Sequence, residues 1–226
     1  MASLTLDGVT VRYPDAATPA LDGLDLYAGD GQFVVIVGPP RAGKSTLLRV
    51  VAGQEEPTAG RVLIGGVDVT AVPAQSRDAV LVFQNYALYP HMSVGDNMSF
   101  ALRVAGVPDD ERRERVFEAA RLLDLTDRLD HSPDELTGPQ RQQVALARAV
   151  VRRPAVLLMD DPLAMLSPDL KDHTADLIRT LVRTLDVTTL HATADPGPLA
   201  SVADRVLRLD SGRLMEDTAG TGARAP

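Results

Sequence analysis

Alternating apolar and polar residues mark the N-terminal part of the chain. Residues 4–11 alternate on either side of an Asp7-Gly8 pair, which predicts two short antiparallel strands joined by a turn. Residues 24–26 alternate in the same way, and residues 61–69 do so on either side of Gly65-Gly66, which is typical of a hairpin. We therefore predict an antiparallel β-subdomain.

Continuous apolar runs of strand length form the second pattern, and such runs are typical of strands buried on both faces of a parallel sheet. The runs are residues 33–37, 79–83, 155–159, 187–191 and 206–209. Residues 94–153 show helical spacing instead, with prolines 108 and 139 at helix starts, and another helix is expected near 169–185. This alternation predicts an α/β domain over residues 1–215, with a mostly parallel sheet and a helical subdomain inserted at about 88–153. Residues 216–226 are small and polar and are expected to form a disordered tail.

Composition narrows the possible functions. The chain of 226 residues contains no cysteine, which excludes disulfides, cysteine-based metal centres and a cysteine nucleophile. Its net charge of −8 disfavours binding to nucleic acid. No apolar run approaches the ~18 residues of a membrane span, and no leader pattern is visible at the N-terminus. We expect an intracellular protein that does not insert into the membrane.

A phosphate-binding loop follows the first continuous apolar run. The segment matches the P-loop pattern and consists of Gly38, Pro39, Pro40, Arg41, Ala42, Gly43, Lys44 and Ser45, with Thr46 next. In such a loop backbone amides surround phosphate oxygens, the lysine reaches the β- and γ-phosphates, and the serine hydroxyl binds Mg²⁺. A chance match is disfavoured because a buried strand precedes the loop and a helix follows it. These residues predict a RecA-like P-loop NTPase that binds the phosphates of a nucleotide.

A second motif is the apolar run 155–159 followed by Asp160 and Asp161. An apolar strand that ends in aspartate is a Walker B pattern, whose carboxylate holds Mg²⁺ directly or through water. An acidic strand end that caps a turn is the alternative, and the P-loop upstream makes it less favoured. Asp160 and Ser45 are therefore the predicted metal ligands.

Several motifs in this order resemble the ATP-binding subunit of ABC transporters, over about residues 3–215. Residues 82–94 resemble the Q-loop segment of the carbohydrate-importer branch, and residues 136–149 stand where that family has its signature motif. The resemblance implies that Tyr13 stacks on adenine and that Gln84 contacts Mg²⁺ or the attacking water. It also implies a head-to-tail dimer in which the signature of one chain, formed by Thr137, Gly138, Pro139 and Gln140, meets the ATP of the other.

The same resemblance implies membrane-subunit partners and a peripheral position at the inner face of the cell membrane. Residues 86–92 would then form part of the socket for a membrane subunit. Importers of this branch usually carry a β-rich regulatory domain after the ATPase domain, and only about ten polar residues follow Met215, so we expect no regulation through such a domain. The transported substrate, the direction of transport and the choice between homodimer and heterodimer are left open.

Four positions depart from the family pattern. Asp161 stands where the family has the glutamate that polarises the attacking water, and Ala194 stands at the switch histidine. Pro139 removes an amide that the signature offers to the γ-phosphate, and Ser167 replaces the D-loop aspartate. His191 lies three residues before Ala194 and is expected to point to the other face of its strand.

Nucleotide binding is therefore expected to be intact and hydrolysis, with Asp161 as the catalytic base, to be weakened. The alternative is a hydrolysis-deficient pseudo-ATPase that uses ATP for dimerisation or docking. A third reading, a small-molecule kinase, is disfavoured by the Q-loop and signature segments.

Overall fold

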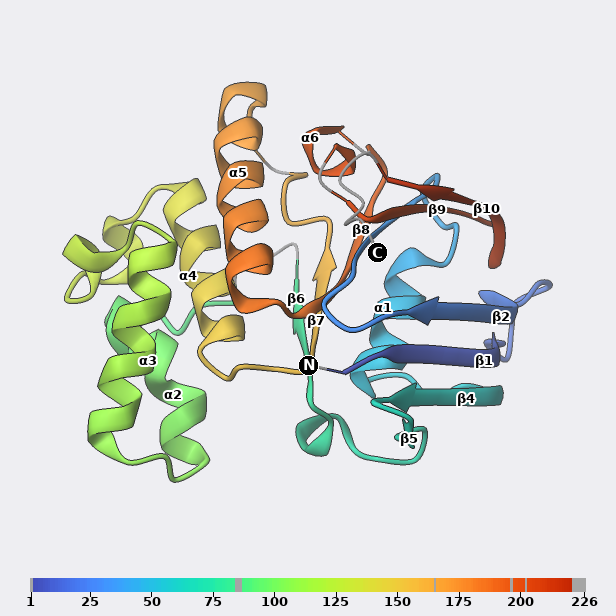
Figure 1. Ribbon diagram of the computed structural model, residues 1–226, viewed down its shortest axis with the longest axis horizontal. Helices are drawn as coiled ribbons and strands as arrows, with labels where there is room; N and C mark the ends of the chain where they lie inside the picture. The colour runs from blue at the N-terminus through green and yellow to red at the C-terminus, as the bar shows by residue number, and fades with distance from the viewer. Residues whose placement is uncertain (1, 84–86, 165, 196, 202, 221–226) are drawn as a thin grey trace. The chain divides into compact units, whose positions relative to one another are not determined.

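The computed structural model describes residues 2–83, 87–164, 166–195, 197–201 and 203–220 (Figure 1). The chain divides into two compact units. The first comprises residues 1–81, 155–161 and 182–226, and the second comprises residues 82–154 and 162–181. The helical unit is thus larger than the range 88–153 expected from the sequence, because it also takes in most of helix α5 (Pro168–Leu185).

The first unit contains two sheets, an antiparallel one in the order β2-β1-β4-β5 and a six-stranded one in the order β10-β9-β3-β8-β7-β6. The strands of the antiparallel sheet are β1 (Leu4–Val11), β2 (Leu21–Ala28), β4 (Ala59–Ile64) and β5 (Val67–Asp68). Those of the larger sheet are β3 (Phe33–Val37), β6 (Ala79–Val82), β7 (Val156–Asp160), β8 (Thr188–Thr193), β9 (Arg205–Asp210) and β10 (Arg213–Ala219). Strands β9, β3, β8 and β7 run parallel, so the predicted α/β class with a separate antiparallel sheet is confirmed.

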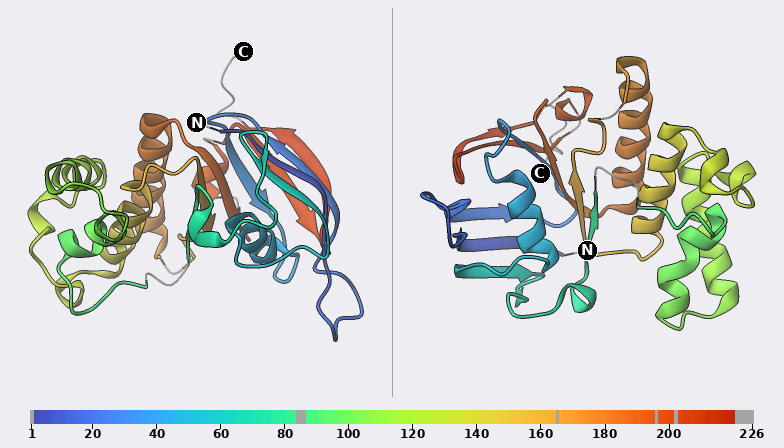
Figure 2. Two further views of the ribbon diagram at one scale, coloured as in Figure 1. Left: turned by 90° about the horizontal axis from the view of Figure 1, so that it is seen from below. Right: turned by 180° about the vertical axis from the view of Figure 1, so that it is seen from behind.

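The core of the first unit joins the inner faces of both sheets to helix α1 (Lys44–Ala52), which contacts β7 and β8 (Figure 2). Alternate residues of the parallel strands face this core, among them Val34, Ile36, Leu158 and Leu190. The other face of the same strands carries His191 and Thr193. Side chains at the carboxyl ends of β3, β7 and β8 therefore meet at the edge where α1 begins.

The second unit is built from α2 (Val94–Val104), α3 (Asp109–Leu122), α4 (Gly138–Val150) and most of α5. Helix α2 contacts both α3 and α4. The remaining helical segments are the short turns η1 (Ala74–Ser76), η2 (Thr126–Arg128) and η3 (Pro133–Glu135), and the four-residue helix α6 (Gly197–Ala200).

The predicted turn at Asp7-Gly8 is wrong. Residues 4–11 form the single strand β1, whose register with β2 shifts between Leu6 and Val9. Gly8 has φ +59° at this bulge and donates its N–H to Asp25 Oδ1 at 2.7 Å. A bulge and a turn both need a residue with positive φ, so the local pattern alone does not separate them.

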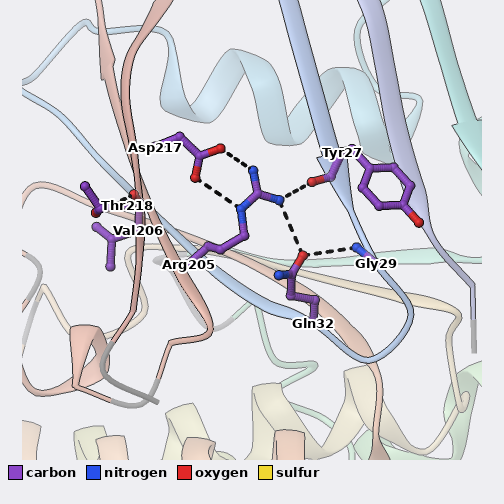
Figure 3. Close-up of polar contacts among 7 residues, drawn as sticks. All are labelled: Tyr27, Gly29, Gln32, Arg205, Val206, Asp217 and Thr218. Carbon is purple, nitrogen blue, oxygen red and sulfur yellow. Dashed lines mark hydrogen bonds and ion pairs between the residues drawn. The ribbon is translucent and has the colours of Figure 1, made fainter. Parts of the chain in front are cut away.

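Part of the expected tail is ordered, because residues 216–219 belong to β10. Arg205 of β9 forms a two-pronged ion pair with Asp217, at 2.5 Å and 3.1 Å, and also donates to the carbonyl oxygen of Tyr27 and to Gln32 Oε1 (Figure 3). Thr218 donates to the carbonyl oxygen of Val206 at 3.2 Å. These contacts hold β10 against β9, whereas residues 221–226 lie outside the described residues.

Candidate functional site

The P-loop connects the carboxyl end of β3 to the first residue of α1. Gly43 is the N-cap of α1, with φ 104°, and no side chain caps this helix end. The first amides of an α-helix have no partner within the helix and carry its positive dipole end. An uncapped helix start that follows a glycine turn therefore presents free N–H donors to an anion.

Close packing requires glycine at two positions of this loop. A Cβ at Gly38 would collide with the carbonyl oxygen of Leu209, and a Cβ at Gly43 with that of Ala20. Between them Ala42 is buried and donates its N–H to the carbonyl oxygen of Pro39 at 3.2 Å. Pro39, Pro40 and Arg41 are exposed, and Arg41 adopts a left-handed backbone with φ 67°.

Lys44 folds its ammonium group back over the loop. Its Nζ donates to the carbonyl oxygens of Gly38 at 2.6 Å and Pro39 at 2.9 Å. Burial lowers the pKa of Lys44, and the nearby carboxylates of Asp161 and Asp160 oppose this shift. The lysine is thus held in the loop beside two acidic groups, where an anionic phosphate would be attracted to its charge.

Ser45 and Asp160 lie together, as the sequence predicts. The Ser45 hydroxyl donates to Asp160 Oδ1 at 3.0 Å, which joins the first turn of α1 to the end of β7. A hydroxyl and a carboxylate oxygen are the hard ligands that Mg²⁺ prefers, and Mg²⁺ completes its shell with water and substrate phosphates. The donor set therefore fits a magnesium ion between these two side chains and a bound nucleotide.

Asp161 follows β7 in a left-handed conformation with φ 46°. Its N–H donates to the carbonyl oxygen of Ala192 at 2.8 Å, and its Oδ1 accepts a hydrogen bond from Thr193 Oγ1 at 3.2 Å. Thr193 also accepts from the Asp195 N–H at 3.1 Å and lies 2.8 Å from the Asp195 carbonyl oxygen. Sequence reasoning did not single out Thr193, and a hydroxyl at a strand end beside the Walker B strand is the signal that could have found it.

Ala194 follows β8 and lines a pocket of about 400 Å³ with Gly38 and Pro39. Its methyl group offers no hydrogen bond to a phosphate at this place. His191 is 1% exposed and lies between the register partners Val35 and Met159. Its side chain is therefore enclosed in the sheet and does not reach the position that Ala194 occupies.

The signature segment begins helix α4 in the second unit. Thr137 is the N-cap and accepts from the Gln140 N–H at 3.4 Å, while Gln140 Oε1 accepts from the Thr137 N–H at 2.9 Å. This reciprocal pair is a capping box. Gly138 is the first helical residue, so Pro139 is the second and not, as its pattern predicted, the first.

The other residues predicted for the site lie outside the cluster formed by Lys44, Ser45, Asp160 and Asp161, or outside the described residues. Tyr13 is 37% exposed in the connection between β1 and β2, within the first unit. Thr46 is part of the first turn of α1 and is half-buried. Gln84 lies outside the described residues. The structure therefore brings together Lys44, Ser45, Asp160 and Asp161, and it places the signature in a separate unit.

A parallel sheet with this loop and this carboxylate pair defines a P-loop ATPase-type domain. Residues 21–164 match the ABC transporter family, and the chain belongs to that family. The diacetylchitobiose uptake system ATP-binding protein MsiK of Streptomyces coelicolor is 50% identical over 216 residues, which are 96% of this chain and 57% of that protein. The sn-glycerol-3-phosphate import ATP-binding protein UgpC of Chromohalobacter salexigens is 46% identical over 216 residues, which are 96% of this chain and 58% of that protein.

Solved structures agree with the sequence relatives. The ATP-binding cassette MJ0796, in a dimeric post-hydrolysis state bound to ADP and Pi, superposes with a TM-score of 0.83 at 26% identity, covering 98% of this chain and 99% of that one. The chain spans a little over half the length of the curated relatives named above. Within the part of the chain that the structure describes, no helix is long and apolar enough to cross a membrane.

Proposed function

We propose that the chain is the ATP-binding subunit of an ABC importer for a carbohydrate or a related polyol phosphate. The observation that carries this proposal is the hydrogen bond between Ser45 and Asp160 at the start of the uncapped helix α1. The chain is also 50% identical to the ATP-binding protein of a diacetylchitobiose uptake system. The substrate class rests on the substrates for which the two relatives, MsiK and UgpC, are named. Partners of this subunit are the membrane subunits of the transporter, which place it at the inner face of the membrane.

ATP is held mainly by the first unit. The amides of the loop and of the α1 start bind the phosphates, Lys44 turns from its two carbonyl contacts toward the β- and γ-phosphates, and exposed Tyr13 stacks on adenine. Ser45 and Asp160 would hold Mg²⁺, with Gln84 as a further ligand or water contact, and the ion would neutralise phosphate charge.

Hydrolysis requires a water molecule, which Asp161 activates. The water oxygen attacks the γ-phosphorus, the bond between this phosphorus and the β,γ-bridging oxygen breaks, and ADP leaves with that oxygen. The proton of the water passes to a carboxylate oxygen of Asp161. Products are ADP and inorganic phosphate.

The complete site takes a second chain. The signature residues Thr137, Gly138, Pro139 and Gln140 of one chain would face the γ-phosphate bound by the other, and the dimeric state of the cassette MJ0796 supports the formation of a dimer. A homodimer and a heterodimer with another ATP-binding subunit both satisfy it. Pro139 offers no N–H to the phosphate.

We further propose that hydrolysis is weakened. The Asp161 carboxylate ends about one C–C bond, roughly 1.5 Å, short of a glutamate carboxylate. Ala194 lines a pocket with Gly38 and Pro39 of the P-loop, and its methyl group cannot donate a hydrogen bond to a phosphate. The same two features favour the second candidate function, a pseudo-ATPase that binds ATP for docking or dimerisation without turnover.

The experiment compares the purified chain with its Lys44→Ala variant in Mg-ATP binding and in single-turnover hydrolysis. Lys44→Ala removes a charge-assisted contact of about 1.5–3 kcal/mol, so affinity is expected to fall about 10- to 100-fold. Lys171→Ala is the matched control, because Lys171 is the only other lysine of the sequence. Equal affinity in the chain and the Lys44→Ala variant contradicts the binding site, and tight binding without any turnover selects the pseudo-ATPase.

A further inference from the structure

The carboxylate of Asp161 accepts a hydrogen bond from the hydroxyl of Thr193. The Oγ1 to Oδ1 distance is 3.2 Å, and it joins the end of β8 to the residue that follows β7. The backbone fixes the same pair, since the Asp161 N–H donates to the carbonyl oxygen of Ala192, the neighbour of Thr193. The hydroxyl therefore acts on a carboxylate whose main chain is already held in place.

The Thr193 hydroxyl is itself oriented. It is 3% exposed, and the Asp195 N–H donates to its oxygen at 3.1 Å, which leaves its single proton for an acceptor. Two acceptors are in range, Asp161 Oδ1 at 3.2 Å and the Asp195 carbonyl oxygen at 2.8 Å. Hydrogen bonds to carboxylate oxygens are stronger than hydrogen bonds to carbonyl oxygens, so Asp161 Oδ1 competes with the Asp195 carbonyl oxygen in spite of the longer distance.

We infer that Thr193 is the positioning residue for Asp161, holding its carboxylate in the orientation from which it accepts the proton of the attacking water. This inference rests on the proposed ATPase function. The position that follows Thr193 is Ala194, whose side chain cannot orient anything by a hydrogen bond, and His191 is enclosed in the sheet. Among the described residues, Thr193 thus supplies the orienting contact from this strand end. A carboxylate fixed by a hydrogen bond spends more time in the reactive geometry than a free one.

Three variants distinguish a role of Thr193 in orienting the Asp161 carboxylate from a role in packing alone. Thr193→Val keeps the shape of the side chain and removes the hydroxyl, while Thr193→Ser keeps the hydroxyl. The matched control is Thr189→Val, because Thr189 is fully buried on the same strand and the same face, and its hydroxyl donates to the Val187 carbonyl oxygen instead. For each protein we would measure Mg-ATP affinity, and kcat and KM for hydrolysis.

The expected result is a kcat about 10-fold or more lower in Thr193→Val, with KM and nucleotide affinity changed less than about twofold. Thr193→Ser is expected to retain kcat within about threefold, and Thr189→Val to match the unmodified chain. A structural role alone would not produce this separation, since both valine variants remove one buried hydroxyl from the same strand. If Thr193→Val does not bind nucleotide, Thr193→Ala takes its place in the comparison.

Each outcome decides between defined alternatives. Equal kcat in Thr193→Val and the unmodified chain overturns the positioning role, and so does a loss of kcat that Thr193→Ser fails to restore. Tight ATP binding by an unmodified chain without turnover also overturns it, because no base is then at work. Absence of ATP binding by the unmodified chain refutes the proposed function itself, which is a different result from any of these.

Discussion

Arg77 provides a test of how helix α1, which follows the P-loop, is anchored. It is 3% exposed, and its guanidinium donates to four backbone carbonyl oxygens. The bonds reach Val50 at 2.7 Å and Val51 at 3.1 Å in the last turn of α1, and Thr70 at 2.7 Å and Val72 at 2.8 Å in the segment after β5. The carbonyls of a helix end have no partners within the helix, so Arg77 acts as a cationic cap on α1.

Replacing Arg77 by Met keeps the aliphatic length and removes all four donors. Hydrogen bonds from a charged group contribute about 1.5–3 kcal/mol each, but these share one side chain and the desolvation of its charge offsets part of the sum. We therefore expect a loss of about 3–5 kcal/mol in the free energy of unfolding. For a chain of this length, that corresponds to a fall in Tm of about 10 °C.

Thermal and urea denaturation of the Arg77→Met variant measure this loss. The control is Arg49→Met, which removes an exposed arginine from the same helix and is expected to change stability by less than about 0.5 kcal/mol. At low temperature, where the variant stays folded, affinity for Mg-ATP is expected to change less than about threefold, because Arg77 holds the opposite end of α1 from the loop. A loss below about 1 kcal/mol, or one equal to that of Arg49→Met, refutes the capping argument.

Three further predictions concern the site and its surroundings. Asp161→Glu combined with Ala194→His is expected to raise kcat about 10-fold or more with KM little changed, and a steady-state ATPase assay that finds no increase contradicts the weakened-site hypothesis. Pro139→Gly is expected to add to this rate only at protein concentrations that form dimers, because in the proposed dimer the restored amide would act on the nucleotide of the other chain. An equal gain at concentrations where sedimentation shows monomers argues against that role. Burial lowers the pKa of His191 from 6.5 to about 3, so the unfolded chain binds a proton that the folded chain excludes, and stability falls as pH drops below 6.5. The cost at pH 5 is about 2 kcal/mol, which His191→Leu is expected to abolish and His131→Gln to leave in place in denaturation curves at pH 7 and pH 5.

The sequence predicted the elements of the nucleotide site because each has a strong local pattern. A continuous apolar run, a glycine turn and a lysine-serine pair specify the strand, loop and helix without reference to the rest of the chain, and β3, the loop and α1 appear as predicted. The P-loop and Walker B motifs predict Ser45 and Asp160 as ligands of one Mg²⁺ ion, and the 3.0 Å hydrogen bond shows that the two side chains lie together. The helix start predicted near Pro139 is likewise present, and Thr137 and Gln140 cap it by bonding each other.

Local sequence patterns gave wrong predictions where the same residue types are compatible with two kinds of local structure. The Asp7-Gly8 pair satisfies a turn and a bulge equally, and only the pairing of β1 with both β2 and β4 makes the strand continuous. The polar residues 216–219 resemble a tail in sequence, and they form a strand because β10 pairs with β9, where Arg205 also binds Asp217.

The sequence by itself determined that this chain is a P-loop protein of the ABC type and which of its residues are candidates for phosphate, magnesium and water. Only the tertiary structure decided how those residues are held. The Thr193 hydroxyl reaches Asp161 across 32 positions of sequence, and Arg77 reaches the end of α1 across 27, so neither contact has a local signature. The physical reason is that backbone conformation and amphipathic pattern act between near neighbours along the chain. Hydrogen bonds between strand ends instead depend on which strands lie side by side, and that is settled when the whole sheet packs.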